Sequence, residues 1–157
     1  MTELEKLFDR VKKHSRRSMH KKGSVHPTFV FEVPGKAGCG VIPCPWDSEL
    51  QKHWMVTQMK AQFAELKVER FGFYVESWIT DLEGLGPYER TPSERLARRQ
   101  EVVLVYVEDR DGSSKTGWWP ISHVGGQVTL GHFITKELGL PSAASTFANM
   151  FAVDIFH

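Results

Sequence analysis

The stretch Val102–Val107, within QEVVLVYVED, is an unbroken apolar run and constrains the fold more than any other part of the chain. A strand with one face in water alternates apolar and polar side chains, whereas an unbroken apolar run needs cover on both faces. We therefore expect a strand over 100–109 that is covered on both sides. A helix predicted at 47–67 supplies one cover. The N-terminal helix, the C-terminal segment or a second subunit supplies the other.

The N-terminal helix is expected over 2–20. Apolar residues recur there at helical spacing, behind a Thr2–Glu5 capping-box pattern. The apolar stripe fades after Val11 while basic residues continue to Lys22. We therefore expect the first half of this helix to dock and the second half to project or fray.

The helix at 47–67 has Ser48 and Gln51 as a capping box, with Asp47 as the rival N-cap. The expected buried face consists of Met55, Val56, Met59, Phe63 and Leu66. The lysines expected to face solvent are Lys52, Lys60 and Lys67.

Strands are expected at about 28–33, 38–43, 68–79, 100–109, 115–122 and 127–133. The sequence DRDGSS predicts a hairpin turn between the fourth and fifth of them. A helical turn at Ser93–Arg98, a short helix at 142–151 and a final extended segment in AVDIF complete the prediction. Because hairpins dominate, the fold class is α+β with a largely antiparallel five- to six-stranded sheet. The expected organisation is a basic helix over 1–22 followed by a single α+β domain over 23–157.

Composition indicates a globular protein of one domain, because 41% of the 157 residues are hydrophobic and 25% are charged. No apolar run has the length of a membrane span, and the N-terminus lacks a signal-peptide pattern. Two cysteines, Cys39 and Cys44, are typical of a reducing compartment. These features predict a cytosolic location, in a cell or in the host of a virus.

Positive charge is concentrated in residues 1–22, which hold eight Lys or Arg against three Asp or Glu. The segment carries +5, so the remainder carries −4 because the whole chain is +1. The cluster that includes Lys12, Lys13, Arg16 and Arg17 could track a phosphate backbone or an acidic protein surface. The structural alternative is a solvated helix end.

Glu76 lies inside a predicted strand, RFGFYVESWIT, on the face it shares with Tyr74 and Trp78. A carboxylate among aromatic rings could act as a general acid or base. The alternative is an ion pair with Arg98 or Arg99 at the start of the next strand.

Trp118 and Trp119 are adjacent on a strand and must point to opposite faces of the sheet. One indole could therefore join Tyr74 and Trp78 as an interface anchor or a stacking platform. The alternative is that terminal segments bury both indoles.

Several motifs fail their tests. Asp109–Gly112 suggests a calcium loop, but its glycine is fourth and its twelfth residue is Pro120. The loop Pro34–Gly40 has a lysine among glycines and precedes a strand, so it is not a phosphate cradle. Cys39, Cys44 and His53 lack zinc-site spacing. We therefore expect no metal and no cofactor.

The chain resembles, in general type, small accessory proteins of phages and mobile elements: it is small, has a basic leader and lacks a catalytic motif. The favoured function is a non-enzymatic module that binds a protein or, through its basic helix, nucleic acid. One alternative is a hydrolase or transferase using Glu76 with Arg98 or Arg99 and His123 or His132. Another is a homodimer joined through the second sheet face. A membrane partner is not expected.

Overall fold

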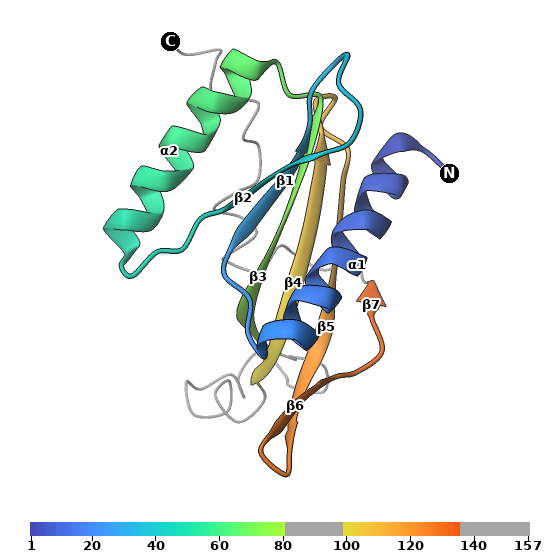
Figure 1. Ribbon diagram of the computed structural model, residues 1–157, viewed down its shortest axis with the longest axis vertical. Helices are drawn as coiled ribbons and strands as arrows, with labels where there is room; N and C mark the ends of the chain where they lie inside the picture. Colours follow the sequence, from blue (N-terminus) through green and yellow to red (C-terminus); the bar gives the residue numbers. More distant parts are fainter. Residues whose placement is uncertain (81–98, 136–157) are drawn as a thin grey trace, which may run out of the picture.

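A computed structural model of the chain describes residues 1–80 and 99–135, which form two helices and a seven-stranded antiparallel sheet (Figure 1). The elements are α1 (Glu3–Lys22), β1 (Thr28–Glu32), β2 (Gly40–Pro43), α2 (Glu49–Leu66), β3 (Arg70–Thr80), β4 (Arg99–Asp109), β5 (Ser114–Val124), β6 (Gln127–Leu130) and β7 (Ile134–Thr135). The predicted α+β class is confirmed. The predicted helices at Ser93–Arg98 and 142–151 and the extended segment in AVDIF lie outside the described residues.

The strands follow the order β2-β1-β3-β4-β5-β6, and β7 also pairs with β5. The longest ladder joins β3 to β4, from the pair Arg70–Asp109 to the pair Thr80–Arg99. The turn between β4 and β5 is the predicted hairpin. In it the Gly112 amide donates to the Asp109 carbonyl at 3.0 Å, and Gly112 has the positive φ of 94° that such turns favour.

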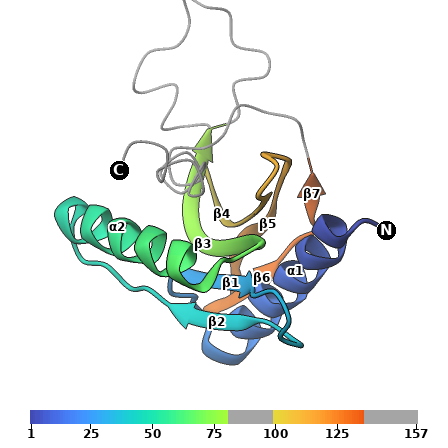
Figure 2. The same cartoon turned by 90° about the horizontal axis from the view of Figure 1, so that it is seen from above.

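The two helices cover opposite faces of the sheet (Figure 2). On one face, α2 packs over a core that includes Phe29, Phe71 and Tyr106. On the other, α1 packs over Val103, Val105 and their neighbours. The prediction for Val102–Val107 is confirmed, because all of these residues are buried. The second cover is α1, so this face does not require a second subunit.

The whole length of α1 lies on the sheet. Its N-terminus has the predicted capping box, in which Thr2 and Glu5 exchange hydrogen bonds of 3.1 Å, and Gly23 ends it in the left-handed conformation. The prediction that the second half projects is wrong, because Ser15 and Met19 are both buried. Ser15 is tolerated there because its hydroxyl is fully used: it donates to the Lys12 carbonyl at 2.8 Å and accepts from the Trp119 indole at 3.2 Å.

The N-cap of α2 is Ser48 rather than Asp47, because the Ser48 hydroxyl accepts from the Gln51 amide at 3.1 Å. The residues of α2 that are buried are Lys52, Val56, Met59 and Phe63. The expectation that Lys52 faces solvent is therefore wrong. Its ammonium lies 5.5 Å from the centroid of Trp46 and 4.0 Å from the Glu49 carboxylate, while its methylene stem is buried.

Neither described helix combines the length and the apolar character that a membrane crossing requires.

Candidate functional site

Residues 7–22 of α1 divide into four rows, because side chains four positions apart lie on the same side of a helix. The buried row is Leu7, Val11, Ser15 and Met19, which rest on the sheet. The outer row, opposite to it, is Asp9, Lys13, Arg17 and Lys21. The groove row, toward β5 and β7, is Phe8, Lys12, Arg16 and His20. The hairpin row, toward the β1–β2 hairpin, is Arg10, His14, Ser18 and Lys22.

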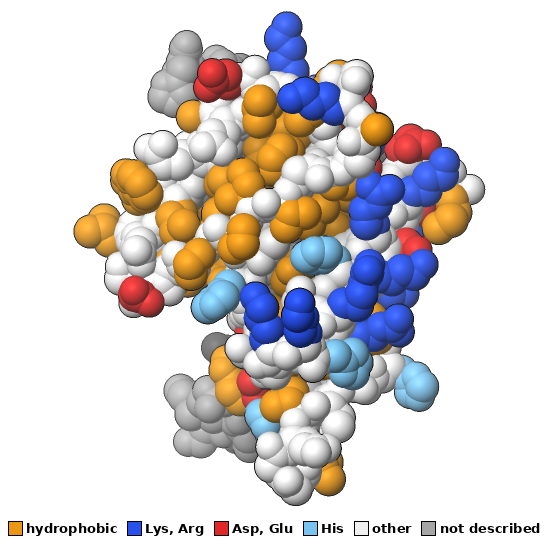
Figure 3. Space-filling view, in the orientation of Figure 1, with side chains coloured by type: hydrophobic (Ala, Val, Ile, Leu, Met, Phe, Trp, Pro, Cys, Tyr) orange, Lys and Arg blue, Asp and Glu red, His pale blue; other side chains and the backbone are white. Residues whose placement is uncertain are grey.

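The second half of α1 carries most of the unneutralised positive charge. Lys13 pairs with Asp9 at 2.9 Å. Within residues 1–80 and 99–135, Arg16, Arg17, Lys21 and Lys22 form no ion pair, and all of them are exposed. Lysine and arginine side chains accordingly gather over α1 in the space-filling view (Figure 3). The sequence predicted that positive charge gathers in this segment, and in the structure these side chains face solvent along one helix.

An open groove of about 520 Å³ lies beside the groove row, and we call it the β5–β7 groove. Arg16 and His20 line it from α1, Trp119 lines it from β5, and His132 and Phe133 line it from the connection between β6 and β7. The guanidinium of Arg16 lies 5.7 Å from the centroid of Trp119. The groove therefore combines an aromatic floor with cationic and imidazole walls, and in the described part of the chain its lining includes no acidic residue.

Fixed contacts hold the aromatic floor in place. The Trp119 indole is bonded to Ser15, and its ring centroid lies 4.9 Å from that of Phe133. Phe133 also meets Phe8 of α1 edge to face at 5.7 Å. A Cβ at Gly117 would lie 2.5 Å from the Phe133 ring, so only glycine at this position lets Phe133 settle on β5.

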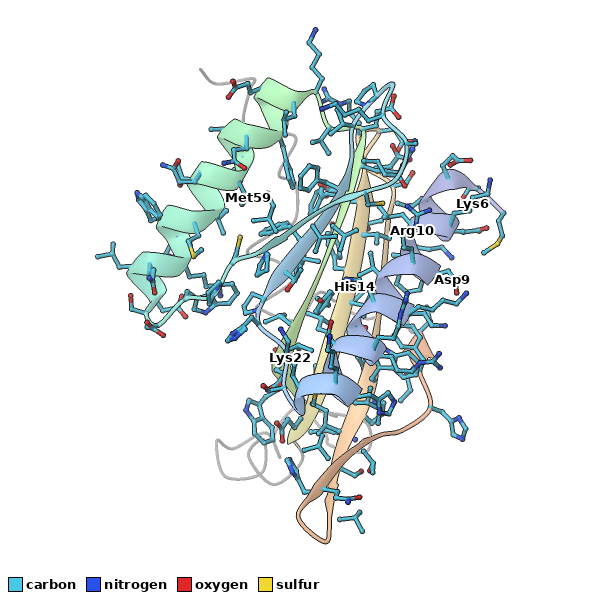
Figure 4. The ribbon with its side chains drawn as sticks, in the orientation of Figure 1. Lys6, Asp9, Arg10, His14, Lys22 and Met59 are labelled. Carbon is cyan, nitrogen blue, oxygen red and sulfur yellow. The ribbon has the colours of Figure 1, made fainter. Side chains whose placement is uncertain are left out.

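A smaller cavity of about 160 Å³ lies on the other side of α1. It lies beside the hairpin row, of which Arg10, His14 and Lys22 are labelled in Figure 4. At its wall the Tyr74 hydroxyl is shared by two residues of α1, with His14 Nδ1 at 2.9 Å and Ser18 Oγ at 3.2 Å. Tyr74 itself is buried. This bonding anchors the second half of α1 to β3 and explains why the helix does not project.

His14 should make stability depend on pH. Burial, and secondarily the nearby charge of Arg17, lower the pKa of His14 below its ordinary value of 6.5. As the pH falls, the unfolded chain therefore binds a proton at His14 more readily than the folded chain does. His14 costs no stability above pH 6.5, and the free energy of unfolding falls as the pH drops below this value. We expect His14→Gln to reduce the loss of stability between about pH 8 and about pH 5 in urea unfolding.

The control for this measurement is His53→Gln on α2, where the replaced imidazole is exposed. The prediction for His14 is contradicted when the His14 and His53 variants lose as much stability in acid as the unmodified chain.

Glu76 points to the α1 face of the sheet, as expected, and binds backbone there. Its carboxylate accepts a hydrogen bond of 2.9 Å from the Val25 amide, in the segment that links α1 to β1. It lines neither the β5–β7 groove nor the smaller cavity. Of the suggested partners, Arg98 lies outside the described residues, and nothing is described of the Arg99 side chain.

The two histidines suggested as partners of Glu76 have other neighbours. His123 contacts the Glu101 carboxylate at 3.0 Å. His132 lines the β5–β7 groove. The proposed catalytic grouping is therefore not assembled in the described part of the chain.

The predicted aromatic surface does not form. Tyr74 and Trp119 are buried beneath α1, and Trp118 is buried on the opposite side of β5. Only Trp78, with 52% of its surface exposed, remains open. The alternative, that Trp118 and Trp119 are both buried, agrees with the structure.

Cys39 and Cys44 belong to opposite faces of the fold. Cys39 packs against the α1-side core and accepts a hydrogen bond of 2.7 Å from Arg10, whereas Cys44 is part of the α2-side core. Burial raises the pKa of the Cys44 thiol. Among the described residues, no group of three or more His, Cys, Asp or Glu side chains is placed to hold a metal ion.

Sequence reasoning did not bring together the residues that complete the groove: His20 was not singled out, and His132 was suggested only as a partner of Glu76. His20 and His132 are 112 positions apart and share no motif with each other. They line the same groove because β7 returns to pair with β5 at Gly117 and Trp118. The available signal was Gly117 itself, a glycine inside a predicted strand, which indicates a close approach of another segment.

Comparisons of the chain with protein-family models, with curated proteins and with solved structures found no match.

Proposed function

We propose that this protein binds nucleic acid, through contacts of α1 with the phosphate backbone. The observation that carries the proposal is the exposed charge of Arg16, Arg17, Lys21 and Lys22, which form no ion pair with any described residue, on a helix whose buried row packs in the core. The helix backbone that carries these cations is already held against the sheet. The entropic penalty of ordering the backbone of a flexible basic tail is therefore avoided.

The spacing of cations within the outer row favours a regular polyanion over a folded acidic protein. Residues of one row follow at steps of about 6 Å along the helix. A nucleic-acid strand carries its charges at a comparably regular repeat. Phosphate contacts of this kind position a protein without reading base sequence, so we expect binding without strong sequence preference.

The helix macrodipole accounts for only part of this charge. Basic residues in the last turn, such as Lys21 and Lys22, stabilise the C-terminus of a helix. Arg16 and Arg17 lie before the last turn, and the macrodipole effect fades within that distance. Because Arg16 and Arg17 are exposed and form no ion pair with a described residue, they support a partner outside the chain.

The test is the salt dependence of binding by the double variant Arg17→Gln/Lys21→Gln. Removing one bound phosphate from the interface should reduce the slope of log K against log salt by about 0.9 for duplex DNA and about 0.7 for a single strand. We therefore expect the slope of the double variant to be shallower by about 1.4–1.8. Fluorescence anisotropy with a labelled oligonucleotide, between about 50 and 200 mM salt, measures it.

The matched control is Lys60→Gln/Lys67→Gln, which removes the same charge from the α2 side of the sheet. Its slope should equal that of the unmodified chain. Equal slopes of log K against log salt for both double variants would show that Arg17 and Lys21 do not contact the bound phosphates. The absence of binding by the full chain at about 50 mM salt would overturn the proposal.

A further inference from the structure

We infer that the β5–β7 groove receives one unstacked nucleotide of a single strand, while the outer row of α1 holds the neighbouring phosphates. The inference rests on the proposed function and names the form of nucleic acid. A phosphate alone would need no apolar floor, and the groove has Trp119, Phe133 and Leu130 beneath its cations. A purely apolar ligand would need no Arg16.

The size of the groove agrees with this occupant. Its volume of about 520 Å³ falls within the range of roughly 300–1,000 Å³ found for sites that hold small organic molecules. The cavity beside the hairpin row, at about 160 Å³, is smaller than that range. The larger space therefore suits a base with its sugar and phosphate.

The planar groups that can sandwich a base are Arg16, His20 and His132. All of them are exposed at the groove, whereas Trp119 and Phe133 are held in the floor by their contacts with Ser15, Gly117 and Phe8. Unstacked bases are commonly stacked on histidine rings and on guanidinium planes. His20 comes from α1 and His132 from the segment before β7, so a base between them would bridge two elements.

Charge complementarity supports the same occupant. None of the described residues that line the groove is acidic, and Lys12 lies beside it, 4.4 Å from the Phe133 centroid. Arg16 belongs both to the groove and to the exposed cations of α1. A strand that follows the outer row would therefore reach the groove without leaving positive surface. In a duplex the bases are paired and stacked, so the groove would stay empty while α1 still contacts phosphates.

The experiment compares a single-stranded oligonucleotide with an abasic strand of the same length and charge. The unmodified chain should bind the base-bearing strand more tightly by at least about fivefold, the lower end of the range for stacking one base. His20→Ala/His132→Ala should bring this ratio close to one. It should leave the affinity for the abasic strand nearly unchanged, because the outer row is intact.

The matched control is His26→Ala/His53→Ala, which removes exposed histidines outside the groove and should keep the ratio. Circular dichroism and thermal unfolding confirm that each variant is folded. Equal affinity of the unmodified chain for both strands would overturn nucleotide binding in the groove while leaving the proposed function intact. An equal loss of affinity for both strands in His20→Ala/His132→Ala would also overturn it. Binding to neither strand would remove the proposed function itself.

Discussion

Phe63→Ala is expected to lower the free energy of unfolding by about 3–5 kcal/mol, the range for removing a buried phenylalanine. Phe63 is the point of α2 that is most deeply inserted into the sheet, with 1% of its surface exposed. Its ring centroid lies 5.3 Å from that of Phe71, 5.5 Å from Phe31 and 5.7 Å from Phe29. Truncation removes all of these contacts and leaves a cavity that three rigid rings cannot collapse to fill.

Urea unfolding of Phe63→Ala measures this loss, and Trp54→Ala on the same helix is the control. Trp54 is as large and apolar but 62% exposed, so its replacement should change stability by no more than about 0.5 kcal/mol. A similar loss in both variants would show that α2 does not pack on the sheet through Phe63.

Gly72→Ala should destabilise the protein by about 1–3 kcal/mol, as overpacking of a dense core does. A Cβ on Gly72 would lie 2.8 Å from Val11 Cγ2 of α1 and 2.8 Å from Val107 Cγ1 of β4. It would also lie 3.1 Å from the Tyr106 carbonyl oxygen, which cannot move without disturbing β4. The absent side chain therefore lets α1 approach the sheet closely.

A double-mutant cycle separates this steric effect from the general effect of replacing a strand glycine. Val11→Ala removes the methyl groups that the new Cβ would meet, so Gly72→Ala should cost less in that background than in the unmodified chain. Gly131→Ala, in the connection between β6 and β7, is the control for a glycine replacement without a clash, because the nearest atom there is at an ordinary 3.5 Å. Additive losses at Val11 and Gly72 would mean that α1 is not held against β3 at this point.

Where the expectations from sequence held, each depended on neighbours along the chain. The Thr2–Glu5 box, the Ser48 cap and the turn after Asp109 are set within a few residues, so a short window contains all the interacting atoms. The strand alternation of Phe71, Phe73 and Val75 also follows from a local rule.

The failures involve polar side chains whose burial depends on one specific partner. Ser15 and Lys52 are polar, so hydrophobic periodicity placed them outside. Ser15 is buried because Trp119, 104 positions away, supplies a hydrogen bond. Lys52 is buried because Trp46 lies under its ammonium group. No periodicity rule contains these pairings.

The sequence by itself determined that β4 lies between two layers, that two capped helices are present and that positive charge gathers in the first 22 residues. Periodicity, capping and charge count are local properties, so they can be read without coordinates. Only the tertiary structure decided that α1 is the second layer and that its basic residues divide between a solvent-facing row and a groove. It also decided that Glu76 accepts a hydrogen bond from the Val25 amide and that His20 and His132 line the same groove. Those arrangements arise from the pairing of β7 with β5 and from the packing of α1 on Gly72, contacts between segments that are far apart in the chain.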